Sequence, residues 1–349
     1  MRSFEHPQTF DPVPGSIVGL LRPIDQGAGG EAQHADQLPQ LLAVLRVQAR
    51  IESVTASSAM EGITVDTARV SKLVSGTESR FRNRSEEEFA GYTEALDYLY
   101  AMPAESLSVG LVCHLHRLLY SHTDGRGGSF KLDDNVVTES NPDGTRSIRF
   151  TPVSARETPY FMDELIVRTE ATFATGTHHP LLVATAFTLD FLCIHPFADG
   201  NGRIARLLTT YLMQRVGYGV GRYISLEQLI FDSRDEYYES LRDSTSGWFD
   251  DGHHSLWPWA EYLLGRLAES YRLFESRVNE GKSGQTKQDR VRMYVLEHAP
   301  QQFSMADLRR ALPGVGDNTL RLVLTALRDE GRIHNEGVGR NATWRRGEE

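Results

Sequence analysis

The sequence predicts a mostly α-helical protein with one short β-hairpin and a separate C-terminal module. Apolar residues recur at helical spacing in most segments between residues 38 and 275. Before the C-terminus, β-rich runs of note occur only around residues 136–150. A polar segment that contains Gly and Ser, residues 277–288, is the best candidate for a linker. We therefore expect a helical core followed by a second, smaller domain.

Length and composition are those of an ordinary globular protein. The chain has 349 residues, 40% hydrophobic and 24% charged, enough for a large core and two or more domains. The net charge of −10 argues against extensive contact with nucleic acid. Cys113 and Cys193 lie in apolar helical stretches, so we expect reduced core residues in a cytoplasmic protein. The N-terminus shows no signal core, and the longest apolar run, residues 181–194, is too short to cross a membrane.

The first 35 residues are rich in Pro, Gly and polar side chains, which favours extended or loop structure. A helical pattern runs from about Leu38 to Met60 and stops at Gly62, a residue type that commonly ends helices. Two further helices are predicted over residues 85–101 and 106–121.

Two short β-rich runs flank the turn sequence of residues 141–144 and predict the hairpin. Helices are predicted again over residues 159–172 and 181–194, then from Gly202 to about residue 215, and as a pair from Ile224 onward. After the linker come two short helices, over residues 304–312 and 317–330, and a hairpin from Ile333 to Trp344. This order is similar to a winged helix, a helix-turn-helix variant.

Residues 195–206, HPFADGNGRIAR, connect two of the predicted helices. Gly200 and Gly202 permit a backbone that turns its N–H groups inward at a helix N-terminus, which makes an anion-binding nest. Arg203 and Arg206 are three residues apart on the following helix and can both face that nest. Their planar guanidinium groups match phosphate oxygens, so the segment predicts a phosphate site.

Two other side chains of this segment are candidates for a metal ligand and a general base. Asp199 can supply a hard oxygen ligand to Mg²⁺, which is usually bound by a few carboxylate and phosphate oxygens. His195 is the one group of the segment that titrates near neutral pH, which makes it the candidate general base.

The segment HPFADGNGRIAR resembles the complete signature of the Fic (filamentation induced by cyclic AMP) family, HPFx(D/E)GNGRxxR. The resemblance implies an all-helical core that transfers AMP from Mg-ATP to a Ser, Thr or Tyr hydroxyl of a target protein, and of the chain itself. It implies His195 as the base, Asp199 as the Mg²⁺ ligand, and Arg203 and Arg206 as catalytic residues. The implied nucleotide-binding residues are Phe197, Gly200, Asn201, Gly202, Arg203, Arg206, Tyr237 and Tyr238. For the two tyrosines, core packing is the alternative.

Ser57, Glu61 and Gly62 form a second pattern, upstream of the first. A glutamate in the last turn of a helix opposes the helix dipole by roughly 0.3 to 1 kcal/mol unless a cation lies near it. Ser57-x-x-x-Glu61-Gly62 is similar to the inhibitory motif (S/T)xxxE(G/N) of Fic proteins, here on a helix over about residues 38–61. The resemblance implies that Glu61 pairs with Arg206 and inhibits the enzyme. An ordinary helix end is the alternative.

In Fic proteins a hairpin at this place in the chain, the flap, lies over the active site and binds the target segment by strand addition. The resemblance therefore implies a target protein bound along about residues 129–150. Fic-like flaps often open with Gly-x-Phe/Tyr-Arg, whereas this chain has Lys131 at the last position. A surface hairpin without a ligand is the alternative.

We expect three regions: residues 1–89 with the inhibitory helix, a Fic catalytic core over residues 90–275, and a winged-helix-like domain over residues 285–349. From residue 282 onward the net charge is +3, against −13 for the rest. DNA contact by Arg321, Arg340 and Arg345 is one expectation for this domain, and protein contact or homodimerisation is the other. Two alternative functions stay open, removal of AMP and non-catalytic regulation by a nucleotide-sensing, DNA-binding protein.

Overall fold

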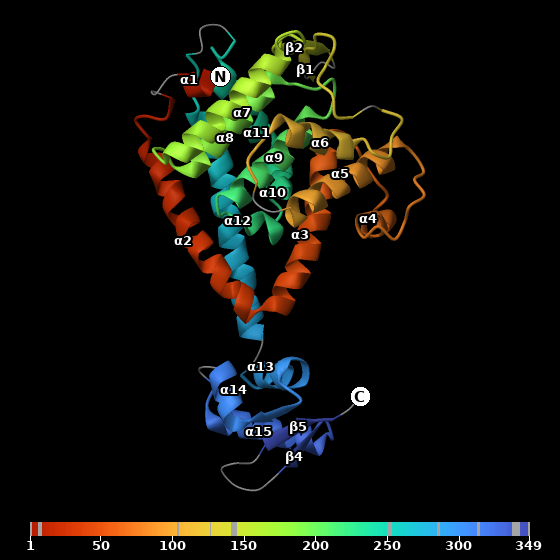
Figure 1. Cartoon of the computed structure of the whole chain (residues 1–349), viewed down its shortest axis with the longest axis vertical. Helices are drawn as coiled ribbons and strands as arrows, with labels where there is room; N and C mark the ends of the chain where they lie inside the picture. Colours follow the sequence, from red (N-terminus) through yellow and green to blue (C-terminus); the bar gives the residue numbers. More distant parts are fainter. Residues whose placement is uncertain are drawn as a thin grey trace. The chain divides into compact units, whose positions relative to one another are not determined.

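The computed structural model describes residues 2–5, 9–102, 105–125, 127–140, 145–249, 253–284, 287–312, 315–336 and 343–347. The chain forms two compact units, Met1–Glu275 and Ser276–Glu349 (Figure 1). In its described residues the first unit is helical apart from one hairpin, and the second combines helices with a small sheet. The mostly helical fold class predicted from the sequence is confirmed.

The first unit holds the elements that precede residue 276. In chain order they are α1 (Arg2–Glu5), α2 (Gly15–Gln37), α3 (Pro39–Met60), α4 (Thr67–Val74), α5 (Arg84–Ala101), α6 (Val109–Leu119), β1 (Val137–Ser140), β2 (Arg146–Phe150), α7 (Thr158–Thr175), α8 (Pro180–Ile194), α9 (Asn201–Arg215), η2 (Val220–Arg222), α10 (Leu226–Asp232), α11 (Arg234–Thr245) and most of α12 (Trp257–Gly284). Strands β1 and β2 pair antiparallel, with Thr138 opposite Ile148, so the predicted hairpin is present. Its turn, residues 141–144, lies outside the described residues.

Helix α8 forms the centre of the first unit's core. Its sequence is almost wholly apolar, and every residue except Pro180 and Leu192 is buried. Asp190, its one charged residue, accepts hydrogen bonds from Ser3 N at 3.1 Å, Ser3 Oγ at 2.7 Å and Trp248 Nε1 at 2.6 Å. Because a buried carboxylate is stable only when its oxygens are satisfied, these bonds anchor α1 and the segment after α11 to α8.

The N-terminal region is helical, which corrects the expectation of loop structure for the first 35 residues. Helix α2 contains a proline and several glycines, residues that weaken an isolated helix. Tertiary packing outweighs this preference, since Leu21 and Ile24 are buried. Gly27 approaches Tyr271 of α12 so closely that a Cβ atom would collide with the ring. Figure 1 shows α2 and α12 side by side.

The linker predicted over residues 277–288 is wrong for residues 277–284, because α12 continues to Gly284. Val278 is fully buried, which gives this polar stretch an apolar anchor. Its Arg, Glu and Lys residues also have good helix propensity. The division between the two units therefore falls inside a helix.

Helix α3 begins and ends close to where the sequence predicts. Gly62 follows it with φ 74°, in the left-handed region. The N–H groups of Gly62 and Ile63 donate to the carbonyls of Ala59 and Ser58 at 3.0 and 3.1 Å. This pair of bonds is a Schellman motif, and it holds Glu61 as the C-cap residue of the helix.

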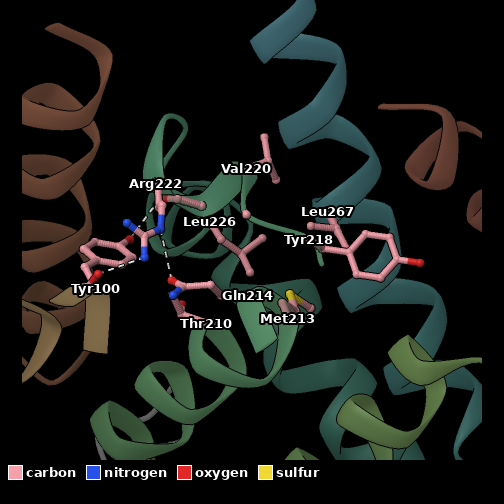
Figure 2. Close-up of a pocket in the computed structure, with 11 residues that line it drawn as sticks. Tyr100, Thr210, Met213, Gln214, Tyr218, Val220, Arg222, Leu226 and Leu267 are labelled. Atoms are coloured by element: carbon pink, nitrogen blue, oxygen red, sulfur yellow. Dashed lines mark hydrogen bonds between the residues drawn. The ribbon is translucent and has the colours of Figure 1, made fainter. Parts of the chain in front are cut away.

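The loop that follows α9 is held by Arg222. This side chain donates to the Tyr100 carbonyl at 2.9 Å and to Gln214 Oε1 at 3.2 Å, as Figure 2 shows. Its guanidinium carbon lies 5.0 Å from the centre of the Tyr100 ring. The space left among these side chains measures about 10 Å³, room for about one water molecule and too little for a ligand.

The second unit has its own hydrophobic core. Its elements are α13 (Lys287–Met293), the π-helical turn η3 (Tyr294–His298), β3 (Gln302–Ser304), α14 (Met305–Ala311), α15 (Asp317–Asp329), β4 (Ile333–Glu336) and β5 (Thr343–Arg346). The sheet order is β3-β5-β4, antiparallel throughout. As predicted, α15 buries Leu320, Val323, Leu324 and Leu327 on one face. Residues 337–342, which include Arg340, lie outside the described residues. Across the described parts of both units, no helix combines the length and apolar character needed to cross a membrane.

Candidate active site

A cavity of about 580 Å³ lies where α8 ends and α9 begins, a volume that suits a nucleotide-sized ligand. Its walls come from the end of α3, the β1–β2 hairpin, the loop between α8 and α9, and α11. Nine of the residues predicted from the sequence line it: Glu61, His195, Asp199, Gly200, Asn201, Gly202, Arg206, Tyr237 and Tyr238. Ser57, Gly62, Phe197 and Arg203 are not among the lining residues.

His195 is the C-cap of α8 and lies in the left-handed region, with φ 51° and ψ 61°. Its Nδ1 is 3.3 Å from the Leu192 carbonyl. Because a carbonyl oxygen only accepts, Nδ1 carries the proton and Nε2 keeps a free lone pair. Burial and the positive charge of Lys131 lower the pKa of His195 to about 4, although Glu61 and Asp199 act in the opposite direction. The imidazole is therefore neutral at pH 7 and can accept a proton.

The start of α9 has the geometry expected of an anion nest. Gly200, the N-cap residue, has φ 80°, and a Cβ atom there would press against Leu119 and Tyr120. The side chain of Asn201 accepts from Phe197 N at 2.9 Å and donates to Phe197 O at 2.8 Å. These bonds close the loop, and they occupy both polar atoms of the Asn201 side chain. Asn201 thus shapes the loop, and its contact with phosphate stays a prediction.

Arg206 is buried and points toward the end of α3. It donates to Ser57 Oγ at 2.8 Å, to Ser57 O at 2.9 Å and to Glu61 Oε1 at 2.8 Å. Burial opposes its charge, but the Glu61 carboxylate prevails and raises the pKa of Arg206. The Glu61–Arg206 contact implied by the sequence is therefore present, and Ser57 is part of it.

Arg203 points away from the cavity, which corrects the expectation that both arginines face the nest. Its side chain is 2% exposed, and its guanidinium donates to Glu88 Oε2 at 2.6 Å and to Tyr120 Oη at 3.0 Å and lies over the Tyr120 ring. Turning Arg203 into the cavity would break this pair and leave the Glu88 charge buried without a partner, which is costly. The geometry supports a structural role for Arg203 and not the predicted contact with phosphate.

Phe197 also faces the interior, which corrects its assignment to the nucleotide site. Its ring stacks on His116 with centroids 3.8 Å apart and an interplanar angle of 2°. His116 Nδ1 accepts from Gly128 N at 2.8 Å, so Nε2 carries the proton and donates to Asp199 O at 3.2 Å. Burial lowers the pKa of His116 to about 4. Neutral His116 thus holds the loop between α8 and α9 through its hydrogen bond to Asp199 O and its stacking on Phe197.

Asp199 is at the open side of the cavity, and its side chain is 67% exposed. One carboxylate oxygen accepts from Gly200 N at 2.6 Å. Groups of three or more His, Cys, Asp or Glu side chains that could hold a metal are absent from the described part of the chain. A single carboxylate is a ligand set that Mg²⁺ can take when phosphate oxygens and water complete its coordination.

Tyr237 and Tyr238 both border the cavity, but they differ in exposure. Tyr237 is buried and packs edge-on against Trp259, whereas Tyr238 is 40% exposed. Arg149 of β2 donates to the Tyr238 carbonyl at 3.0 Å and lies over its ring. Arg149 thereby links the hairpin to α11 across the cavity.

The Fic/DOC family model matches residues 106–213, from just before α6 almost to the end of α9. The matched span includes His195, Asp199, Arg203 and Arg206. This chain carries a Fic/DOC domain.

Curated relatives share modest identity with this chain. A protein adenylyltransferase Fic from Nematostella vectensis is 25% identical over 220 residues, which cover 61% of this chain and 47% of the relative. A protein adenylyltransferase Fic from Drosophila erecta is 29% identical over 134 residues, 38% of this chain and 25% of the relative. The matches thus span about half the length, or less, of these relatives.

Solved structures share the fold. A Fic family protein from Desulfovibrio desulfuricans G20 superposes with a TM-score of 0.64 at 23% identity, covering 97% of this chain and 98% of that chain. Fic-1 (residues 134–508) from C. elegans superposes with a TM-score of 0.57 at 20% identity, covering 77% of this chain and 72% of that chain. At these identities the likeness shows the fold alone.

Several residues that shape the Fic/DOC site were missed by sequence reasoning. Glu88 and Tyr120 hold Arg203 from 115 and 83 residues away, so no local pattern could reveal them. His116 lies on an apolar helix, where a histidine is most simply explained by packing. Its contact with the loop between α8 and α9 depends on tertiary structure.

Proposed function

We propose that this chain is a protein adenylyltransferase that transfers AMP from Mg-ATP to a Ser, Thr or Tyr hydroxyl of a target protein and is inhibited by Glu61. One observation carries the proposal: a neutral imidazole, a helix N-terminus and the Glu61–Arg206 pair lie around a single cavity of nucleotide size. The relatives named protein adenylyltransferase Fic support AMP transfer as the reaction.

In the proposed reaction the hydroxyl oxygen of the target forms a bond to the α-phosphorus of ATP. The bond from that phosphorus to the oxygen bridging to the β-phosphorus breaks, and pyrophosphate leaves. His195 Nε2 accepts the hydroxyl proton, since Nδ1 already carries one and faces Leu192 O. Such a base contributes roughly 10² to 10⁴ in rate.

The phosphates would lie at the start of α9. Free N–H groups and the helix dipole favour negative charge there, and the glycines leave space for it. Arg206, once released by Glu61, would supply a forked donor for phosphate oxygens. Asp199 fits Mg²⁺ because it is an exposed carboxylate at the cavity, and one carboxylate plus substrate phosphates is a common Mg²⁺ ligand set. Bound Mg²⁺ would neutralise phosphate charge and orient the triphosphate.

Inhibition would follow from competition for Arg206. The Glu61 carboxylate takes a donor that a terminal phosphate would otherwise use. ATP could then bind only with its α-phosphorus turned away from attack. This part of the proposal is carried by the contact itself, which joins residues 145 positions apart.

The test uses intact mass spectrometry and α-labelled ATP. The parent, His195→Ala and Glu61→Gly proteins are incubated with Mg-ATP, and label and mass are recorded on the chain. The proposal expects the protein to gain the mass of one adenylyl group. The modified fraction should be largest in Glu61→Gly and zero in His195→Ala, and both variants should still bind ATP. Transfer by a folded His195→Ala protein would contradict the assigned base. A mass increase that corresponds to phosphate or to UMP, when the matching nucleotide is supplied, would show that the chain transfers that group and not AMP.

AMP removal is a second candidate, because Glu61 lies in the same cavity as His195 and could orient a water molecule. The two reactions separate on isolated AMP-modified protein. If Glu61 serves removal, the parent releases AMP from the modified chain in the absence of ATP and Glu61→Gly does not.

Interaction partners belong to the same proposal. Strand addition along β1–β2 is supported by the position of the hairpin at the cavity. The second unit has the element order of a winged helix, and Arg321 and Arg345 are exposed on it. Arginines of this unit pair with acidic groups, as Arg309 does with Asp317, which reduces the positive surface. A binding assay with a DNA pool, set against sedimentation analysis of self-association, would choose between DNA and protein contact.

A further inference from the structure

Lys131 lies in the segment that leads into β1, and its side chain is buried, with 4% exposure. Its Nζ donates to Asn135 Oδ1 at 2.7 Å and to Ile194 O at 3.3 Å. Its backbone N–H donates to Pro196 O at 2.9 Å. A single residue therefore holds the carbonyls on both sides of His195.

Asn135 completes the contact. While its Oδ1 accepts from Lys131, its Nδ2 donates to Phe197 O at 3.1 Å. Lys131 and Asn135 together bind three of the four carbonyls from residue 194 to residue 197. We call this pair the loop brace.

The loop brace acts on a residue with an unfavourable backbone. Among the described residues, His195 is the only one other than glycine with positive φ. A side chain in that region raises the energy of the backbone, and such a conformation persists only when its surroundings enforce it. The bonds at Ile194, Pro196 and Phe197 supply that enforcement.

Charge favours a lysine in this position. Ile194 O is among the last carbonyls of α8, where the helix dipole is negative and a cation is stabilised. Burial lowers the pKa of Lys131 to about 8, against the opposing effect of Asp134, so the amine is mostly charged at pH 7. That charge also opposes protonation of His195, while Glu61 and Asp199 favour it.

We propose that Lys131, with Asn135, is a positioning residue that holds His195 in its left-handed conformation and couples it to the base of the hairpin. Lys131 does not line the cavity, so it acts through His195 and not by touching nucleotide. The inference rests on the proposed function only where transfer rates are used, and the titrations below require no activity.

The first test follows resonances by NMR in the parent, Lys131→Met, Lys131→Arg and a matched surface control, Lys72→Met. In Lys131→Met the His195 ring should titrate at higher pH by roughly one pH unit, since a neighbouring cation is gone. Lys131→Arg and Lys72→Met should match the parent. A folded Lys131→Met protein with unchanged His195 titration overturns the proposal.

The parent alone gives a second measurement, in case Lys131→Met does not fold. The ¹³C resonance of the Ile194 carbonyl should shift with a midpoint near pH 8, where Lys131 loses its proton. In Lys131→Arg this step should vanish. A parent resonance without such a step contradicts the contact.

The third test measures transfer in folded variants that carry Glu61→Gly to raise the signal. Lys131→Met and Asn135→Ala should lower kcat by roughly 10- to 100-fold and leave the Kd of ATP unchanged. Lys131→Arg should recover most of the rate. Unchanged kcat in both variants overturns the positioning role. Failure of every protein, the parent included, to transfer AMP instead contradicts the proposed function, and the titrations then decide the role of Lys131.

Discussion

Glu61 and Gly202 lie so close that a Cβ atom at position 202 would collide with Glu61 Oε1. The carboxylate therefore lies against Gly202 in the first turn of α9, within the cavity that also holds Gly200 and Asn201. Gly202 is needed for this approach as well as for the approach of a phosphate. The carboxylate is thus bound both by Arg206 and by the electrostatics of a helix N-terminus.

Replacing Glu61 by Gly should raise AMP transfer by roughly 5- to 150-fold, the usual range of a coupling free energy between two ligands of one site. The change frees Arg206 for phosphate; Gly at the C-cap costs up to about 1 kcal/mol of stability, and the lost partner of the buried Arg206 adds to this. Labelling with α-labelled ATP measures the gain. Glu52→Ala, which removes another α3 carboxylate outside the cavity, should match the parent.

Adding Arg206→Ala to Glu61→Gly should cancel that gain, because the freed arginine is itself needed for the triphosphate. A folded Glu61→Gly protein that binds ATP and transfers no more than the parent would contradict the inhibitory role.

The cavity was predictable from sequence where its parts are local. His195, Asp199, Gly200, Gly202 and Arg206 lie within twelve residues. Glycines and guanidinium groups at that density indicate an anion site, and the carboxylate indicates a metal ion bound beside the anion. The pairing of Glu61 with Arg206 could be anticipated because a carboxylate at a helix C-terminus calls for a cation.

What the sequence did not show depends on distant partners. The direction of Arg203 is set by Glu88, and that of Phe197 by His116, both on other helices. Helix α2 was missed because its glycines weaken local helix propensity, although one of them, Gly27, serves close packing against Tyr271. Its stability comes from tertiary contacts that no window of sequence contains.

The acid limb of kcat/KM for transfer should lie near pH 4, well below the ordinary value of about 6.5 for histidine. Since the imidazole must be neutral to accept a proton, the rate is full above this pKa and falls as pH drops through it. Bound triphosphate brings negative charge, so the limb of kcat should lie at higher pH than that of kcat/KM. Rate profiles of the parent and the Glu61→Gly protein between pH 3 and 8 measure both, and the limb of Glu61→Gly should lie slightly lower because Glu61 favours protonation of His195. A kcat/KM limb near pH 6.5 would show that the pKa of His195 is unperturbed.

Asp199→Ala should remove Mg²⁺-dependent transfer and leave the fold intact, because the side chain is exposed and its loop is held by His116 and Asn201. Transfer is followed over a Mg²⁺ titration, with melting temperature as the check on folding. Asp133→Ala, an exposed carboxylate before the hairpin, serves as the control. Equal Mg²⁺ curves for Asp199→Ala and the parent would exclude this metal ligand.

His116 should make the protein less stable in acid. Its pKa is about 4 in the folded chain and about 6.5 when unfolded, so the unfolded state binds more protons between these values. The contribution is complete above pH 6.5 and falls by up to about 3 kcal/mol as pH decreases through 4. His116→Phe keeps an aromatic ring for stacking and cannot titrate.

Denaturant unfolding at several pH values measures this effect. The loss of unfolding free energy between pH 7 and 4 should be smaller in His116→Phe than in the parent. His114→Phe, a half-buried histidine on the same helix, should keep most of the parent's slope. Identical slopes in the two variants would contradict the assignment to His116.

The contact of Arg206 with α3 makes Glu61 a ligand tethered to its own binding site. Its effective concentration is set by the packing of α3 and changes neither with dilution nor with nucleotide supply. ATP that binds beside the tethered carboxylate saturates the cavity and still leaves turnover slow. Under the proposed function, the maximal rate then reports how often α3 withdraws, so the chain would respond to whatever moves this helix and not to the amount of ATP.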